Sequence, residues 1–173
     1  MSTIAPCLWF DGNAEEAAAF YASRIPDSRV DRVVRSPIDY PGGAAGSALV
    51  VEFTLAGRPF IGLNGGGGVP FTNAVSFSIE CEDQAEVDRF WDALSDGGAP
   101  VACGWLTDRF GMPWQIVPKI MTEMLAGPDR ERAARAMQAM MGMVKLDVAA
   151  LKAAYEGEAA EGPPVPRSLA TAK

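Results

Sequence analysis

The chain carries one pattern twice, and this repeat constrains the fold more than any other feature. Each copy contains a helix start, an aromatic pair and a Gly-x-Pro-aromatic segment: Asn13–Glu16, Phe20-Tyr21 and Gly57–Phe60 in the first copy, and Asp83–Glu86, Phe90-Trp91 and Gly111–Trp114 in the second. The repeat is longer than the roughly 20–50 residues of solenoid repeats. It therefore predicts two similar modules that enclose a shared cleft, and we expect the functional residues in that cleft.

Composition limits the classes of protein to consider. The 173 residues suffice for one well-formed domain, and 49% hydrophobic with 21% charged residues is typical of a globular protein. The net charge is −7 and no run of Lys or Arg occurs, which disfavours nucleic acid as a partner. No stretch approaches the ~18 apolar residues of a membrane span, and the N-terminus does not resemble a secretion signal. We therefore expect a cytoplasmic protein that does not bind membranes.

The chain contains no histidine, which excludes several chemistries. Ser-His-Asp and Cys-His nucleophiles, imidazole acid–base catalysis and histidine metal sites all require that side chain. The three cysteines, Cys7, Cys81 and Cys103, are scattered singly, which is typical of small apolar residues in a reducing compartment. Metal sites built from carboxylates alone remain open, and no catalytic residue is identified.

Hydrophobic periodicity predicts an α+β fold in which each half has the order β-α-β-β-β, although the second half shows one strand fewer. We expect a single domain over residues 1–155, followed by a disordered tail over residues 156–173. Within that domain we expect module one at 3–64, module two at 72–118 and C-terminal helices at 119–155. Residues 65–68 form a glycine run, interpreted as a linker or rim, with a ligand cradle as the alternative.

This arrangement resembles the vicinal oxygen chelate superfamily, the fold of glyoxalase I, extradiol dioxygenases and bleomycin-resistance proteins. Two sequence motifs are similar to those of the PhnB-like branch: Phe10–Ala17 with Phe20-Tyr21, and Cys103–Pro118. Members of this branch are often labelled demethylubiquinone methyltransferases. The resemblance covers roughly residues 3–155. It implies pairing of modules within or between chains, and we expect a homodimer with the methionine-rich helix at its interface.

The resemblance also indicates where metal-dependent members place their ligands. The last-strand positions match Ile61 and Gln115, and the first-strand positions match Ser76 and a residue near Pro6, with that register uncertain by one. Ile61 and Pro6 offer no side-chain donor, Ser76 is a poor ligand, and one neutral Gln115 cannot hold a divalent cation. We therefore expect neither a metal ion nor a cofactor.

Strand alternation predicts which side chains face the cleft, and these are the candidate ligand-binding residues: Leu8, Phe10, Ile61, Leu63, Ser76, Ser78, Glu80, Trp105 and Gln115. Phe60 and Trp114 are expected to pack in the core instead. A mostly apolar pocket with a few neutral polar groups suits an aromatic or amphiphilic small molecule.

These residues indicate a metal-independent small-molecule binding protein, for sequestration or sensing. One alternative is a metal-dependent lyase, isomerase or dioxygenase, with the metal bridged by Gln115, Glu80 and waters. A second alternative is the methyltransferase that the family label suggests. It is disfavoured because the chain lacks the glycine-rich first turn and doubly wound sheet that commonly bind S-adenosylmethionine.

Overall fold

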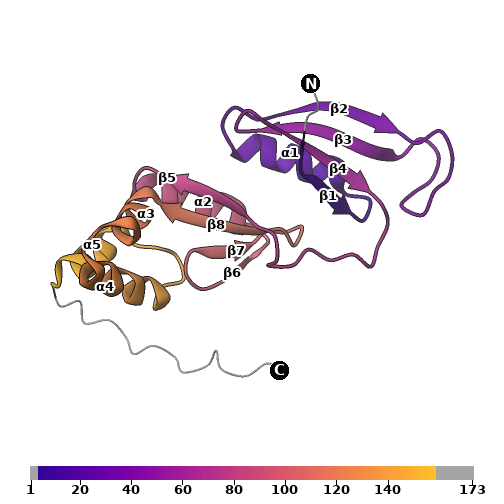
Figure 1. Cartoon of the computed structure of the whole chain (residues 1–173). Helices are drawn as coiled ribbons and strands as arrows, with labels where there is room; N and C mark the ends of the chain where they lie inside the picture. Colours follow the sequence, from indigo (N-terminus) through magenta and orange to yellow (C-terminus); the bar gives the residue numbers. More distant parts are fainter. Residues whose placement is uncertain (1–3, 159–173) are drawn as a thin grey trace. The chain divides into compact units, whose positions relative to one another are not determined.

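The computed structural model describes residues 4–158, which fall into two compact units, one up to Phe71 and one from Thr72. Each unit contains a four-stranded sheet with one helix packed on a single face, as Figure 1 shows. The α+β class and the repeated βαβββ plan are confirmed. Across residues 4–158, no helix has both the length and the apolar character needed to cross a membrane.

The first unit has a mixed sheet with the strand order β1-β4-β3-β2. Its elements are β1 (Cys7–Phe10), α1 (Ala14–Arg24), β2 (Arg29–Arg35), β3 (Ala48–Leu55) and β4 (Arg58–Asn64). Strands β1 and β4 run parallel, and the other neighbours run antiparallel. Two parallel strands need a crossover connection between them. The connection from β1 to β4 begins with α1, immediately after β1.

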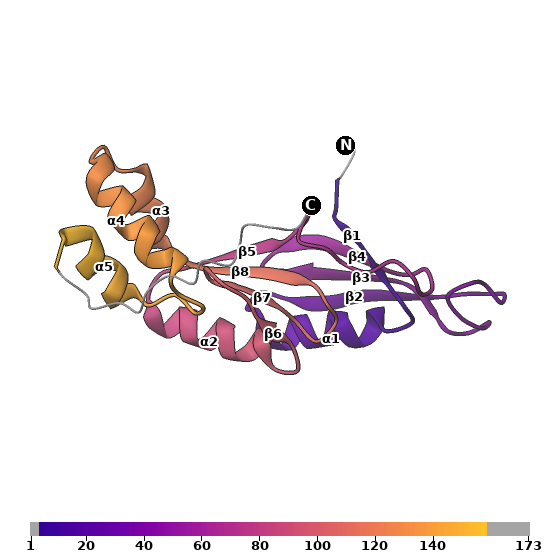
Figure 2. The same cartoon turned by 90° about the horizontal axis from the view of Figure 1, so that it is seen from below.

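The core of the first unit lies between α1 and one face of this sheet. Alternate strand residues point towards the helix and are buried, among them Leu8, Phe10, Val51, Phe53 and Phe60. Gly62 lets the helix approach closely, since a Cβ atom there would lie 3.1 Å from the Cβ of Ala14. The other face of the sheet carries no helix of this unit (Figure 2).

Helix α1 begins at the predicted residue but is capped by an unexpected one. The Asn13 side chain makes no capping hydrogen bond. Asn64, buried at the end of β4, accepts a hydrogen bond of 2.9 Å from the backbone N–H of Ala14. Its Nδ2 donates to the carbonyl of Ala48 over 2.8 Å. One amide side chain therefore ties α1, β3 and β4 together.

The second unit repeats the plan with the strand order β5-β8-β7-β6. Its elements are β5 (Phe77–Cys81), α2 (Gln84–Ser95), β6 (Ala99–Pro100), β7 (Trp105–Thr107) and β8 (Pro113–Pro118). The two-residue β6 is the strand that periodicity missed. Residues 101–104 form no strand, because Cys103 and Gly104 adopt positive φ angles of 61° and 78° and turn the chain before β7.

Three helices follow the second sheet: α3 (Lys119–Ala126), α4 (Arg130–Met141) and α5 (Val148–Glu156). They enclose a small core of Met121, Met124, Ala136, Leu146 and Leu151. Because α5 continues to Glu156, the predicted tail begins too early, and its remainder from 159 onwards lies outside the described residues.

The methionines of α4, called here its methionine stripe, lie partly against this core and partly in solvent. Met140 packs against the core, whereas Met137 and Met141 are 48% and 52% exposed. The stripe is therefore only partly explained by packing within the unit.

The C-terminal helices are attached to the second βαβββ unit by specific hydrogen bonds. Gln84, at the start of α2, donates to the Leu146 carbonyl over 3.2 Å and accepts from the Val148 N–H over 2.7 Å. The backbone N–H groups of Cys103 and Gly104 donate to the carbonyls of Met143 and Val144, each over 2.8 Å. The segment between α4 and α5 is therefore held from two sides.

Candidate ligand-binding site

Each sheet has one face that its own helix does not cover, called here its open face. On the second sheet this face carries Ser78, Glu80, Trp105, Thr107, Gln115 and Val117. The opposite face carries the buried Leu106, Trp114 and Ile116. Ser78, Glu80, Trp105 and Gln115 therefore lie on the face opposite the buried one, and Trp114 lies in the core.

The centre of the second open face is a hydrogen-bonded pair on neighbouring segments. Gln115 Nε2 donates to Ser76 Oγ over 2.8 Å. The register places Ser78 beside Gln115 on one side and Trp105 beside it on the other. Since side chains opposite each other on adjacent strands lie about 5 Å apart, these residues form one continuous patch.

The pair retains free hydrogen-bonding capacity for a ligand. Gln115 keeps its carbonyl oxygen and a second N–H, and the Ser76 hydroxyl keeps its own hydrogen as a donor. The half-buried Trp105 supplies apolar surface beside these groups, whereas Val117 packs against the core of the C-terminal helices. The patch can therefore orient a neutral polar group of a molecule whose remainder is apolar.

A buried carboxylate sets the orientation of the strand that carries Gln115. Asp108, 3% exposed, accepts from the N–H groups of Phe110 and Met112 over 2.8 Å and 3.0 Å, and from the indole of Trp114 over 2.8 Å. Successive strand residues point to opposite faces, so fixing Trp114 on the helix side turns Gln115 to the open face. Asp108 is thus a structural residue of the turn.

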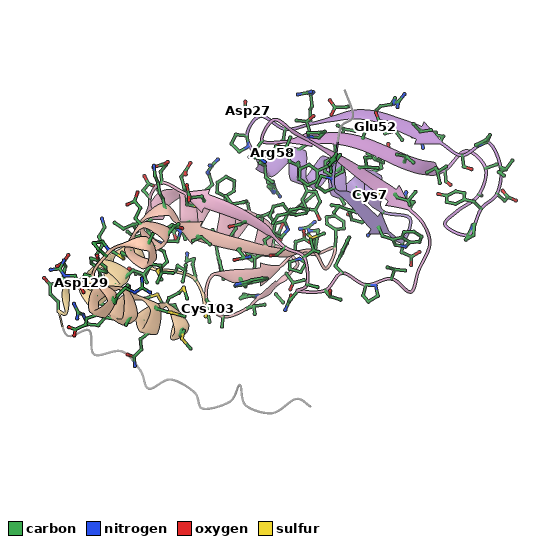
Figure 3. The ribbon with its side chains drawn as sticks, viewed as in Figure 1. Cys7, Asp27, Glu52, Arg58, Cys103 and Asp129 are labelled. Atoms are coloured by element: carbon green, nitrogen blue, oxygen red, sulfur yellow. The ribbon has the colours of Figure 1, made fainter. Side chains whose placement is uncertain are left out.

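The open face of the first sheet has a different character and contains two rows of side chains. The apolar row is Trp9, Leu63, Val50 and Val34, and the mixed row is Cys7, Ile61, Glu52 and Arg32. Figure 3 labels Cys7 on β1 and Glu52 on β3. Arg32 Nε donates to Glu52 over 3.0 Å, and this hydrogen bond lowers the pKa of Glu52 and raises that of Arg32.

The expected orientation of two first-unit residues was wrong. Leu8 and Phe10 are 5% and 3% exposed and point towards α1. The parallel register pairs Cys7 with Ile61 and Trp9 with Leu63, so Cys7 and Trp9 occupy the open face with Ile61 and Leu63. Aligning the Gly-x-Pro segments equates Ile61 with Gln115 but leaves the parity of β1 open, which this register settles.

The same register resolves which residues occupy the superfamily's ligand positions. Ile61 pairs with Cys7 as Gln115 pairs with Ser78, so Ala5 is the counterpart of Ser76, one residue before Pro6. Two of the four positions therefore have no donor atom.

The other two positions, Ser76 and Gln115, hold neutral groups that are bonded to each other. Within residues 4–158, no three His, Cys, Asp or Glu side chains gather closely enough to hold a metal ion. Divalent cations prefer several anionic or imidazole ligands, so these residues do not fit the superfamily's metal ion.

Two βαβββ units, each with a helix on one face of its sheet and an open face opposite, define the vicinal oxygen chelate class. The model of the family described as 3-demethylubiquinone-9 3-methyltransferase matches residues 2–117. The chain belongs to this PhnB-like family of the vicinal oxygen chelate superfamily. No curated protein matches the chain significantly.

Solved structures agree with this placement. The PhnB protein of Bacillus cereus, provisionally named a 3-demethylubiquinone-9 3-methyltransferase, is 30% identical, with a TM-score of 0.61 over 68% of this chain and 99% of its own. Protein PA1353 from Pseudomonas aeruginosa is 20% identical, with a TM-score of 0.57 over 68% of this chain and 98% of its own. The family match ends at residue 117, so α3, α4 and α5 lie outside it.

Proposed function

We propose that this protein binds a small aromatic or amphiphilic molecule without a metal ion, for sequestration or sensing. The observation that carries the proposal is the bond between Gln115 and Ser76. Two positions that hold metal ligands elsewhere in the superfamily here carry side chains that hydrogen-bond to each other. These side chains keep further donors and acceptors for a neutral group of a ligand. The counterpart positions, Ile61 and Ala5, supply only apolar surface.

Each open face, taken by itself, offers a different kind of surface to a small molecule. The second face offers Ser76, Ser78 and Gln115 beside Trp105, whereas the first offers Ile61, Leu63 and their apolar neighbours. Binding sites for such molecules are mainly apolar, with a few polar groups that fix orientation. Glu80 is exposed at the end of β5 and is assigned no catalytic role.

A compound screen with metal control tests the proposal. Thermal shift followed by calorimetry, against aromatic and amphiphilic compounds, should find binding that EDTA leaves unchanged. Gln115→Ala should weaken that binding about fivefold to tenfold, as expected for one lost ligand hydrogen bond. Gln138→Ala, which alters an exposed glutamine of α4, is the matched control. Binding that requires added Zn²⁺, Mn²⁺ or Mg²⁺ would contradict the proposal.

Two enzymatic alternatives have direct tests. Stoichiometric metal in purified protein, lost in Gln115→Ala, would favour a metal-dependent lyase, isomerase or dioxygenase. The family's description makes a methyltransferase the other candidate. Neither sheet is the parallel, doubly wound type that commonly binds S-adenosylmethionine, so calorimetry with this cofactor should give no heat.

The proposal extends to assembly and location. The edge strand β2 and the exposed Met137 and Met141 suit a homodimer, because such edges and apolar patches are usually covered. Light scattering should give twice the monomer mass, and Met137→Glu should reduce it if α4 contributes. Three free thiols fit the reducing cytoplasm.

A further inference from the structure

Trp9 is an exposed aromatic side chain held in one orientation. It lies on the open face of the first sheet, 37% exposed, and its indole N–H donates to the carbonyl of Gly66 over 2.8 Å. Its six-membered ring packs directly on Gly65. These two contacts restrain the indole on the sheet surface.

The glycine run supplies both restraints. A Cβ atom at Gly65 would lie 2.1 Å from the indole, so another residue there would displace the ring. Gly66 has a φ angle of 97°, a conformation that favours glycine. A Cβ atom at Gly66 would lie 3.0 Å from the carbonyl oxygen of Pro41. Residues 65 and 66 are therefore packed parts of the first unit, and their packing holds Trp9.

Trp9 begins a continuous apolar strip across the sheet. The apolar row runs from Trp9 through Leu63 and Val50 to Val34, one residue from each strand. Strand spacing makes this row about 14 Å long. Leu63 and Val50 are half-buried, whereas Val34 is 37% exposed like Trp9. The strip is apolar along its length and aromatic at one end.

We infer that Trp9 is a stacking surface for a planar aromatic small molecule of two or three fused rings that lies along the apolar row of the first sheet. This inference rests on the proposed function and names its ligand class. A restrained indole loses little side-chain entropy when any ligand binds. Ring stacking on its face favours aromatic over aliphatic ligands of equal size. The mixed row beside it offers one ion pair, Arg32–Glu52, for a polar substituent.

Two probes of equal charge test the stacking contact in the full-length protein. Calorimetry with 2-naphthalenesulfonate and with octanesulfonate should show tighter binding of the aromatic probe. Trp9→Leu should weaken naphthalenesulfonate about fivefold to tenfold and leave octanesulfonate within about twofold, because leucine keeps apolar area but cannot stack. Trp9→Phe should retain most of the aromatic preference. Circular dichroism and thermal melting check that each variant is folded.

A pair of glycine variants tests the restraint. Gly65→Ala should lower naphthalenesulfonate affinity as Trp9→Leu does, since the new methyl group displaces the indole. Gly67→Ala is the matched control, because its Cβ would meet only the movable carboxylate of Asp11. If Gly65→Ala does not fold, the Trp9 variants, which change an exposed side chain, still decide the question.

Several outcomes would overturn the inference. These are equal losses for both probes in Trp9→Leu, unchanged naphthalenesulfonate binding in that variant, or wild-type protein that binds neither probe at millimolar concentration. If Trp9 variants bind screened compounds normally while Gln115→Ala does not, the stacking inference fails and the proposed function stands.

Discussion

The indole nitrogen of Trp114 donates a hydrogen bond of 2.8 Å to the buried carboxylate of Asp108. This bond joins the β7–β8 turn to the helix-facing side of β8, and the next residue, Gln115, points the opposite way. The turn motif therefore acts on the candidate site without touching it. We therefore expect this bond to contribute to the free energy of unfolding and to hold Gln115 on the open face.

Asp108→Asn should lower the free energy of unfolding by about 1–3 kcal/mol, because an amide cannot accept from all three N–H donors without turning its NH₂ group towards one of them. Urea denaturation followed by tryptophan fluorescence measures the change. Arg109→Ala, which removes the exposed ion pair with Asp96, should cost no more than about 1 kcal/mol. Equal effects of the two substitutions would contradict the assigned role of Asp108.

The cap of α1 gives a second comparison. Asn64→Ala should lower the free energy of unfolding by about 2–3 kcal/mol, because it removes two buried hydrogen bonds, to Ala14 and to Ala48. Asn13→Ala should change it by less than about 0.5 kcal/mol, since that side chain caps nothing. Chemical denaturation of both variants decides the point, and a larger effect at Asn13 would refute it.

Gln84→Ala should release the C-terminal helices from α2. The segment around Leu146 and Val148 loses one donor and one acceptor, at a cost of about 1–2 kcal/mol. Amide hydrogen exchange in α4 and α5 should then accelerate about fivefold to thirtyfold. Gln138→Ala, on the exposed side of α4, should leave exchange unchanged. Protection that survives in Gln84→Ala would show that the Gln84 hydrogen bonds are not needed to hold these helices.

The cysteines should differ in reactivity and in their effect at alkaline pH. Burial raises the pKa of Cys81 from 9.0 to about 12, whereas Cys7 is exposed. A group whose pKa rises on folding stabilises the fold below its unfolded pKa, so this contribution is present below pH 9 and declines between pH 9 and about 12.

Ellman's reagent at pH 8 should therefore modify Cys7 in native protein and Cys81 only after unfolding. Cys81→Ala should show a smaller loss of unfolding free energy between pH 9 and 12 than the wild type does. Rapid labelling of native Cys81, located by mass spectrometry, would contradict its burial.

Much of the fold could be predicted because it depends on local and repeated signals. The Gly-x-Pro segments predicted the positions of β4 and β8. Asp83 caps α2, as its spacing indicated, and accepts a hydrogen bond of 2.9 Å from the Glu86 N–H. The two-residue β6 could not be predicted, because its pairing with β7 depends on a turn at Cys103 and Gly104. Periodicity needs more than two residues to be detected.

The candidate site was predictable in the second unit and only partly in the first. Ser78 and Gln115 alternate clearly with buried neighbours, so their face followed from the pattern. The segment from 3 to 10 is apolar almost throughout, so nothing local distinguished Leu8 from Trp9. The capping role of Asn64 lies 50 residues from Ala14 and depends on the tertiary fold.

The hydrogen bonds of Gln84 have a consequence for comparing this protein with its relatives. Besides its bond to Asp88 within α2, the Gln84 amide holds a segment that exists only in a chain continuing beyond residue 118. Relatives that stop where the shared family match stops are free to place another side chain there. Position 84 should therefore serve as a sequence marker that separates long homologues from short ones.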